Sequence, residues 1–331
     1  MWRRVKGILR PNGFHGELFA PPFFEGWYVK LVDRAAEERI AVIVGVFEAE
    51  RTDETHAFMQ IFDGLRGQAA SLRFDRADLR ASSAKLDVEL EGSRLTERAL
   101  SLAVDRAGHQ LHGRIDFGQL SPWPVRLRSP GAMGWYGWMP FMQCYHGVVS
   151  MDHGIRGHLE WNHRSYDFAD GRGYLEKDWG RAFPSSWIWL QSNHFSESRV
   201  SLMGSIARIP WIGRSFAGFL VGFQLGPRLV RFATYTGAKT VRLEVQGDDV
   251  HWVMRDRRHE LAIQAHRGPT TALRGPSFDG MERTVDETLQ GRIQVQLSRR
   301  GWRKGVVFEG TGEAAGVEMH GDFAELGAKP T

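Results

Sequence analysis

The chain has 331 residues, of which 42% are hydrophobic and 25% are charged, a composition typical of a folded protein rather than a disordered one. Its formal net charge is +4 at pH 7, and basic and acidic residues are interspersed, so we expect no nucleic-acid partner. The length suits two domains, which we place at residues 1–165 and 166–331.

Targeting features are few. The single cysteine, Cys144, excludes an internal disulfide and is typical of a reducing compartment, so we expect a cytoplasmic protein. We expect no signal peptide, because the basic N-terminal residues are not followed by an apolar core. We expect no membrane span, because the most apolar region, residues 200–226, is interrupted by arginines and a proline. A basic cluster could make a weak peripheral contact with anionic lipid headgroups or simply be solvated. It consists of Arg3, Arg4, Lys6 and Arg10.

The first part of the chain is predicted to be a series of short antiparallel strands. Residues 40–44 are apolar on both faces and should form a central strand, whereas residues 85–90 alternate and should have one solvated face. Strands at this spacing indicate a barrel or a sandwich. The expected strands are residues 26–32, 40–47, 56–62, 69–74, 85–90, 100–105 and 110–117.

Prolines and a glycine interrupt this series between residues 122 and 131, and the residues that follow, up to Cys144, are aromatic without a period. We interpret them as an ordered crossing segment with one short helical turn, lying over a barrel mouth. The alternative is a hydrophobic linker between the two domains.

Several potential metal ligands follow this segment. Imidazole and carboxylate are common ligands, but the spacing fits no standard site, so we expect no metal. Cys144 and His146 could also form a nucleophile–base pair, yet the sequence supplies no orienting third group and no oxyanion hole. The potential ligands are His146, Asp152, His153, His158 and His163.

Residues 173–195 hold the densest set of polar and aromatic groups. Glu176 and Asp178 share one parity of an extended strand and Lys177 with Trp179 the other. Farther on, alternation predicts one shared face of flat aromatic rings and uncharged amides, which is typical of a ligand-lining wall. Core filling is the alternative for any one of these residues. The shared face comprises Trp187, Trp189, Gln191, Asn193 and Phe195.

The second half returns to short strands joined by hairpin turns, which favours a pseudo-duplicated β architecture. The glycines follow no strand-to-helix pattern, so we expect no nucleotide cofactor. The expected strands are residues 200–209, 219–225, 229–235, 240–246, 250–255, 260–266, 290–297, 305–308 and 314–320.

Four blocks of sequence resemble the tocopherol cyclase family, in the order in which that family has them. They are FFEGWY at residues 23–28, MPFMQCYHG at 139–147, EKDWG at 176–180 followed by Phe-Pro and W-x-W-x-Q-x-N up to residue 193, and AGVE at 315–318. The first and third blocks also look like those of carotenoid hydratases and lipocalin-like cyclases. The resemblance implies an all-β chain of two lipocalin-like antiparallel β-barrels and an apolar small-molecule ligand.

The resemblance also implies a cofactor-independent, acid-catalysed cyclisation or hydration of an isoprenoid such as a prenylated phenol. An acid can protonate an alkene only if apolar surroundings raise its pKa, and aromatic faces can stabilise the resulting cation. Asp178 is the first candidate for the catalytic acid, Glu25 the second and Glu176 the third. The expected substrate-binding residues are Trp27, Tyr28, Lys177, Trp179, Trp187, Trp189, Gln191, Asn193 and His194.

The sequence leaves other roles open for the acidic residues and for the whole protein. Glu25 and Asp178 could be structural groups that pair with basic side chains or backbone amides where strands begin, and Lys177 could keep one carboxylate ionised. The whole protein could be a non-catalytic carrier of a lipid or pigment, or an interaction protein whose aromatic residues merely join two barrels. Nothing in the sequence specifies the oligomeric state.

Overall fold

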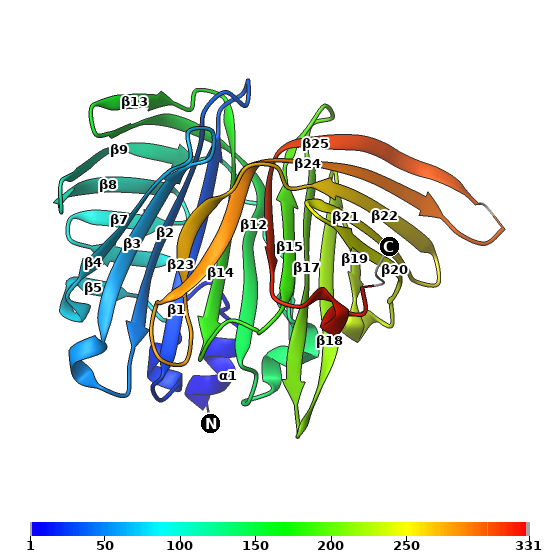
Figure 1. Ribbon diagram of the computed structural model, residues 1–331, viewed down its shortest axis with the longest axis horizontal. Coiled ribbons are helices and arrows are strands. Elements are labelled where there is room, and N and C mark those ends of the chain that lie inside the picture. The colour runs from blue at the N-terminus through cyan, green and yellow to red at the C-terminus, as the bar shows by residue number, and fades with distance from the viewer. Residues whose placement is uncertain (1, 303, 329–331) are drawn as a thin grey trace. The chain divides into compact units, whose positions relative to one another are not determined.

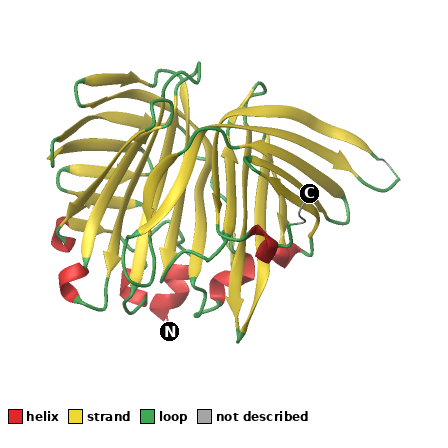
Figure 2. Ribbon diagram, in the orientation of Figure 1, coloured by secondary structure: helices red, strands yellow, loops and turns green. Residues whose placement is uncertain are grey.

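The computed structural model describes residues 2–302 and 304–328, and these are almost entirely β-structure (Figure 2). None of the helices in this described part is long and apolar enough to cross a bilayer. The helical elements are α1 (Trp2–Ile8), η1 (Gly16–Leu18), η2 (Thr52–Glu54), η3 (Arg76–Asp78), η4 (Gly134–Trp138), η5 (Thr234–Thr236) and η6 (Phe323–Leu326).

The chain divides into two compact units. The first unit contains Met1–Phe183 and Leu273–Thr284, and the second contains Pro184–Ala272 and Val285–Thr331. The division expected after residue 165 falls inside a strand of the first unit, Arg164–Asp167, and it stays a prediction about independently folding domains.

A 12-stranded antiparallel sheet forms the first unit, in the order β4-β3-β2-β1-β14-β12-β9-β8-β7-β6-β5, with β13 paired to β12 (Figure 1). A separate two-stranded ribbon pairs β10 with β11. The strands are β1 (Phe23–Val32), β2 (Arg39–Glu48), β3 (His56–Asp63), β4 (Gln68–Phe74), β5 (Leu79–Ala81), β6 (Asp87–Leu90), β7 (Ser93–Thr96), β8 (Ala99–Arg106), β9 (His109–Phe117), β10 (Val125–Arg126), β11 (Ser129–Pro130), β12 (Cys144–Trp161), β13 (Arg164–Asp167) and β14 (Gly171–Gly180).

Hydrophobic patterning explains where these strands lie. β2 carries the doubly apolar run and is indeed central, paired with β1 and β3, and Ile40 and Val42 are fully buried. β6 alternates between half-buried and buried residues, so its predicted solvated face is also confirmed. Apolar residues on both faces of β2 favour an interior position, because only there are both faces covered.

An 11-stranded antiparallel sheet has the order β19-β18-β17-β15-β25-β24-β22-β21-β20, with β16 paired to β25 and β23 paired to β24. It makes up the second unit except for residues 273–275 of β23 and 283–284 of β24, which belong to the first unit. Its hydrophobic core includes Ile188, Leu190, Phe223 and Trp252. The strands are β15 (Trp187–Ser192), β16 (His194–Phe195), β17 (Val200–Trp211), β18 (Arg214–Leu225), β19 (Arg228–Ala233), β20 (Lys239–Gln246), β21 (Asp249–Arg255), β22 (His259–His266), β23 (Thr271–Gly275), β24 (Arg283–Arg299) and β25 (Gly305–His320).

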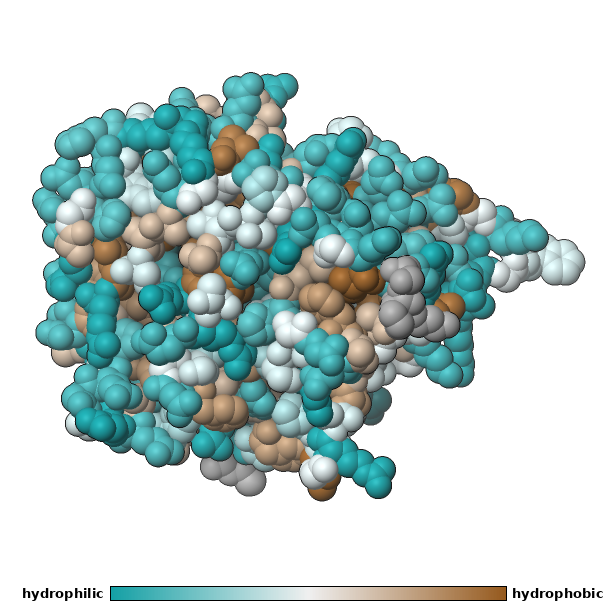
Figure 3. All heavy atoms as spheres, viewed as in Figure 1, coloured by the Kyte–Doolittle hydropathy of each residue, from teal (hydrophilic) through white to brown (hydrophobic). Residues whose placement is uncertain are grey.

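The all-β prediction is therefore confirmed in its coarse form. Each large sheet is an open strand path within the described residues, so the two closed, duplicated barrels stay a prediction. The crossing segment contains the expected helical turn, η4. Hydrophilic and hydrophobic residues are intermixed over the face in Figure 3, as the interspersed charges of the sequence suggest.

Candidate functional site

β14 positions the predicted carboxylates because it lies between β1 and β12. Residues directly opposite each other on neighbouring antiparallel strands point to the same side of the sheet. One side, the Lys177 face, carries Lys177 and Trp179 of β14 opposite Trp27 and Glu25 of β1. This confirms the predicted separation of Lys177 and Trp179 from Glu176 and Asp178.

The other side is the His146 face. Here Glu176 lies opposite Tyr28 of β1, and Asp178 lies opposite His146 of β12. The two faces are separated by only the backbone of β14. Three consecutive residues of one strand, Glu176, Lys177 and Asp178, therefore contribute to two distinct charged networks.

A fully buried ion pair forms the centre of the Lys177 face. The Lys177 ammonium contacts the Glu25 carboxylate, and neither side chain is exposed. The ammonium also donates to the carbonyl oxygen of Gly13 and lies 5.1 Å from the ring centroid of Trp27 and 4.8 Å from that of Trp179. These contacts offset the cost of burying two charges, which a lone pair in an apolar interior would not recover.

Burial controls the ionisation of this pair. It lowers the pKa of Lys177 to about 8, and the attraction of Glu25 only partly offsets that effect. Burial alone would raise the pKa of Glu25, but the charge of Lys177, together with the contacts of His15, outweighs it and the pKa is lowered. Glu25 is thus held as a carboxylate at neutral pH.

His15 completes the Lys177 face, although no sequence pattern points to it. Its backbone N–H donates to Glu25 Oε2 at 2.8 Å, and its Nδ1 lies 2.9 Å from Lys177 Nζ and 3.0 Å from Glu25 Oε1. Nε2 lies 3.2 Å from the carbonyl oxygen of Gly7, which can only accept. Burial, assisted by the charge of Lys177, lowers the pKa of His15. The ring is therefore neutral, with Nε2–H donating to Gly7 and Nδ1 accepting from Lys177.

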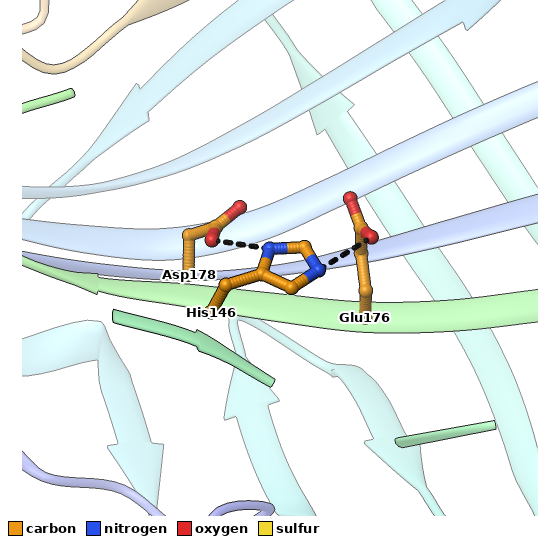
Figure 4. A group of neighbouring side chains, drawn as sticks. All are labelled: His146, Glu176 and Asp178. Atoms are coloured by element: carbon orange, nitrogen blue, oxygen red, sulfur yellow. Dashed lines mark hydrogen bonds and ion pairs between the residues drawn. The ribbon is translucent and has the colours of Figure 1, made fainter. Parts of the chain in front are cut away.

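On the His146 face, an imidazole lies between two carboxylates (Figure 4). His146 Nδ1 is 2.8 Å from Asp178 Oδ1, and Nε2 is 3.3 Å from Glu176 Oε2, an ion-pair distance without hydrogen-bond alignment. The hydroxyl of Tyr174 donates to the same Glu176 carboxylate. Burial acts to lower the pKa of His146, but Asp178 and Glu176 outweigh it and raise the pKa to about 10. His146 is accordingly an imidazolium at neutral pH.

Within the described residues, His146, Glu176 and Asp178 could together hold a metal ion, because one ligand atom from each lies within 4.8 Å of the others. The imidazole, however, directs its two nitrogens at different carboxylates (Figure 4). One ion could not contact His146, Glu176 and Asp178 together unless the ring turned. The arrangement fits a shared proton better than a metal.

A pocket of about 390 Å³ lies in the first unit on the Lys177 face of β14, and His146 from the opposite face also borders it. Trp179 forms part of its wall and is stacked between two other wall residues, 4.5 Å from the His15 ring and 5.4 Å from the Tyr145 ring. The lining also contains residues of the crossing segment, which thus contributes to a binding cavity rather than only connecting strands. Among the lining residues are His15, Phe19, Met133, Tyr145, His146 and Trp179.

The remaining candidates lie on β15 and β16 of the second unit. Trp187 and Trp189 are buried on the face opposite Ile188 and Leu190, which belong to the core. Trp187 Nε1 donates to Glu318 Oε2 at 2.8 Å. Gln191 and Asn193 are fully buried, and His194 is half-buried beside Asn193. The expected convergence of these residues with Glu25 and Asp178 stays a prediction.

One expectation on this segment is wrong. Phe195 was expected to share the face of Trp187, but it packs in the core with Ile188 and lies 5.9 Å from the ring of Phe308. The reason is that β15 ends at Ser192 and β16 begins at His194, so the alternation is interrupted at Asn193 and the next side chains change sides.

Two alternatives for the central stretch are weakened by their surroundings. Burial raises the pKa of the Cys144 thiol well above its usual range, which disfavours the reactive thiolate. Asp152 accepts from Arg172 Nε at 2.8 Å. His153 is buried with its Nδ1 3.0 Å from Ser150 Oγ, and His163 is exposed, so these residues do not form one ligand set.

Charged groups buried among aromatic rings beside a pocket, on an all-β scaffold, define an all-β protein with a concave, aromatic-lined site. The chain belongs to the tocopherol cyclase-like family, whose family model matches residues 115–321. It is 26% identical over 210 residues to a probable chloroplastic tocopherol cyclase of Oryza sativa subsp. japonica, covering 60% of this chain and 44% of that protein. It is 25% identical over 209 residues to a chloroplastic tocopherol cyclase of Zea mays, covering 60% and 43%. The chain spans less than half the length of these relatives in the matched region.

Solved structures share the fold at low sequence identity. A putative AttH from Nitrosomonas europaea superposes with a TM-score of 0.53 at 14% identity, covering 93% of this chain and 95% of that one. CghA in complex with Sch210972 superposes with a TM-score of 0.54 at 11% identity, covering 93% of each chain. At these identities the likeness concerns the fold alone.

Proposed function

We propose that the chain binds an apolar small molecule in the pocket of the first unit and acts on it as a cofactor-independent cyclase. The observation that carries this proposal is a pocket with aromatic and apolar lining that borders His146, an imidazolium whose ring lies on the other side of the sheet from the rings of Trp179 and Tyr145. The names of the rice and maize relatives support a prenylated phenol as the substrate class.

The reaction is an isomerisation that consumes no proton. A proton passes from His146 to the less substituted carbon of a trisubstituted alkene, which leaves a tertiary carbocation. The phenol oxygen then forms a C–O bond to that cation and releases its own proton, which returns to the imidazole. Capture of the cation by water instead would give hydration.

The aromatic wall suits the cationic intermediate. Aromatic side chains in the lining, among them Phe19 and Tyr145, can attract a developing positive charge without donating a nucleophile. A pocket that excludes water from these faces also strengthens electrostatic attraction within it.

The carboxylates expected as proton donors take other roles in this proposal. Asp178 and Glu176 hold the proton of His146 and act through it, as one unit sharing a proton. Glu25 is ionised and sealed behind His15 and Trp179, so it positions these wall residues. His146, which borders the pocket, is the proton donor in this proposal.

A second candidate, a non-catalytic carrier, is favoured by one specific observation. The carboxylates that keep His146 protonated also make it a weak acid, with a pKa of about 10, whereas alkene protonation calls for a strong one. A carrier would use the same pocket and release its ligand unchanged.

Turnover of a geranylated hydroquinone to its chromanol, followed by liquid chromatography and mass spectrometry, distinguishes these functions. We expect His146→Gln and Asp178→Asn to lower turnover at least ~100-fold, while His163→Gln, an exposed histidine of the same unit, retains it. Equal turnover by His146→Gln and the wild type at unchanged melting temperature would sink the mechanism. Binding of the hydroquinone without conversion would establish the carrier.

We also propose the weak peripheral lipid contact expected from the basic N-terminus. Arg4 of α1 donates to the carbonyl of Trp138 at 3.3 Å, which joins that cluster to η4. Near it in sequence, Trp135 is 40% exposed and Phe141 48% exposed. Exposed aromatic rings beside basic residues are typical of surfaces that contact anionic headgroups.

A further inference from the structure

The pocket has a strongly one-sided set of charged groups. Arg4, Arg181 and His146 line it beside the neutral His15, and no aspartate or glutamate does among the lining residues of the described chain. Both arginines are exposed, so they form the solvent-facing rim of the pocket. A rim of this sign attracts anions.

Neither rim guanidinium is neutralised by the protein. The contact of Arg4 is with a backbone carbonyl, that of Trp138, and Arg181 lies 5.9 Å from the ring centroid of Phe278. No ion pair of either arginine occurs in the described parts of the chain. Arg94, by contrast, is paired with Asp87 at 2.9 Å.

The other charges near the pocket largely cancel. Lys177 is paired with Glu25, and His146 faces the two carboxylates of Glu176 and Asp178. These networks leave one uncompensated negative charge, which the two rim arginines outweigh. An empty pocket of this kind has unmet positive charge at its rim and apolar surface inside.

We infer that the ligand of this pocket is an apolar molecule with an oxyanion head group, most simply a carboxylate, which Arg4 and Arg181 bind at the rim. The inference rests on the proposed function of the pocket and specifies the class of molecule that enters it. The planar guanidinium fork matches a carboxylate or phosphate, and charge-assisted hydrogen bonds to such groups are stronger than neutral ones.

The volume limits the apolar part. At roughly 30 Å³ for each water-sized group, about 390 Å³ holds roughly 13 such groups. A chain of about ten to fifteen carbons therefore fills the pocket with its head group at the rim, and any longer chain must extend outside it.

The test compares three probes that share one farnesyl chain: farnesoic acid, farnesol and farnesyl monophosphate. Each is titrated into the full chain by calorimetry below its aggregation concentration. We expect the acid to bind about tenfold more tightly than the alcohol, and this preference to weaken as salt is added. The variant Arg4→Gln/Arg181→Gln should bind both equally, whereas Arg228→Gln, an exposed arginine of the second unit, should keep the preference.

The outcomes distinguish the inference of an anionic ligand from the proposed binding function of the pocket. Tighter binding of the acid or the monophosphate, lost in the double variant, supports an anionic ligand and identifies which oxyanion it carries. Equal binding of acid and alcohol by the wild type overturns the inference but leaves the pocket as a site for neutral molecules. Binding of none of the three overturns both the inference and the proposed pocket function.

Discussion

The free energy of unfolding should fall as the pH rises from 7 to 8, because His146 keeps its proton only in the folded state. Its pKa is about 10 between Asp178 and Glu176, against about 6.5 for an unfolded histidine. Between these values the folded chain binds one proton more than the unfolded chain. Raising the pH therefore favours unfolding.

The magnitude follows from linkage. One proton bound only by the folded state gives at most about 1.4 kcal/mol per pH unit, so we expect a loss of about 1 kcal/mol over this window. Lys177, whose pKa is lowered to about 8, acts with the opposite sign and already loses part of its proton in this window, so it offsets roughly a third of the loss. The buried histidines His15 and His153 have lowered pKa values and act mainly below about pH 6.5, so His146 dominates the change between pH 7 and 8.

Urea unfolding followed by tryptophan fluorescence at several pH values between 7 and 8 measures this slope. His146→Gln should be less stable and its stability should no longer fall across the window, while His163→Gln should retain the wild-type slope. The two compact units can unfold in separate transitions, in which case the relevant one is that shifted by His146→Gln.

A wild-type slope near zero, or one that His146→Gln leaves unchanged, would refute the assignment of a proton to His146. The expected slope requires only that the folded pKa exceed about 9. The result is thus decisive even if the two carboxylates hold the proton less firmly than the geometry suggests.

Three further predictions follow from the structure. Lys177→Met should destabilise the first unit by about 3–5 kcal/mol in urea unfolding, because it leaves the Glu25 carboxylate buried without a counter-charge. The double variant Glu25→Gln/Lys177→Met should recover part of this loss. Wild-type stability of Lys177→Met would contradict the prediction. Gly157→Ala should lower the melting temperature clearly. A Cβ at this position would lie 2.0 Å from a backbone oxygen of the neighbouring strand, and the φ of Gly157 is 137°, which side chains other than glycine rarely adopt. An unchanged melting temperature would count against the strand register. Trp135→Ser/Phe141→Ser should reduce cosedimentation with vesicles containing phosphatidylserine, and equal binding by this variant would remove the lipid-contact proposal.

Much of the fold could be predicted because the alternation of apolar and polar residues indicates where strands lie. β2 and β3 lie within a residue or so of the predicted ranges. Longer strands were harder: β25 is continuous from Gly305 to His320, although two separate strands were expected. Gly312 breaks the pattern there, because a Cβ at that position would lie 2.7 Å from Ser192 Oγ and 2.8 Å from the Phe195 ring.

The site was predicted only in part. Alternation within one strand separates Lys177 from Asp178, and the structure confirms that separation. Partners distant in sequence could not be assigned, because pairing between strands decides them. His15 had no signal at all, and His146 was considered as a metal ligand or base instead of the partner of Asp178.

The pleat of β14 has a consequence for how relatives of this chain can vary in length. Deleting or inserting a single residue upstream within Gly171–Gly180 would act like a frameshift, moving the ammonium to the imidazolium side and the two acids to the tryptophan side. We therefore expect length changes in the loops that flank this strand and a fixed residue count within it. Point substitutions test one network at a time, whereas a one-residue indel would scramble both at once.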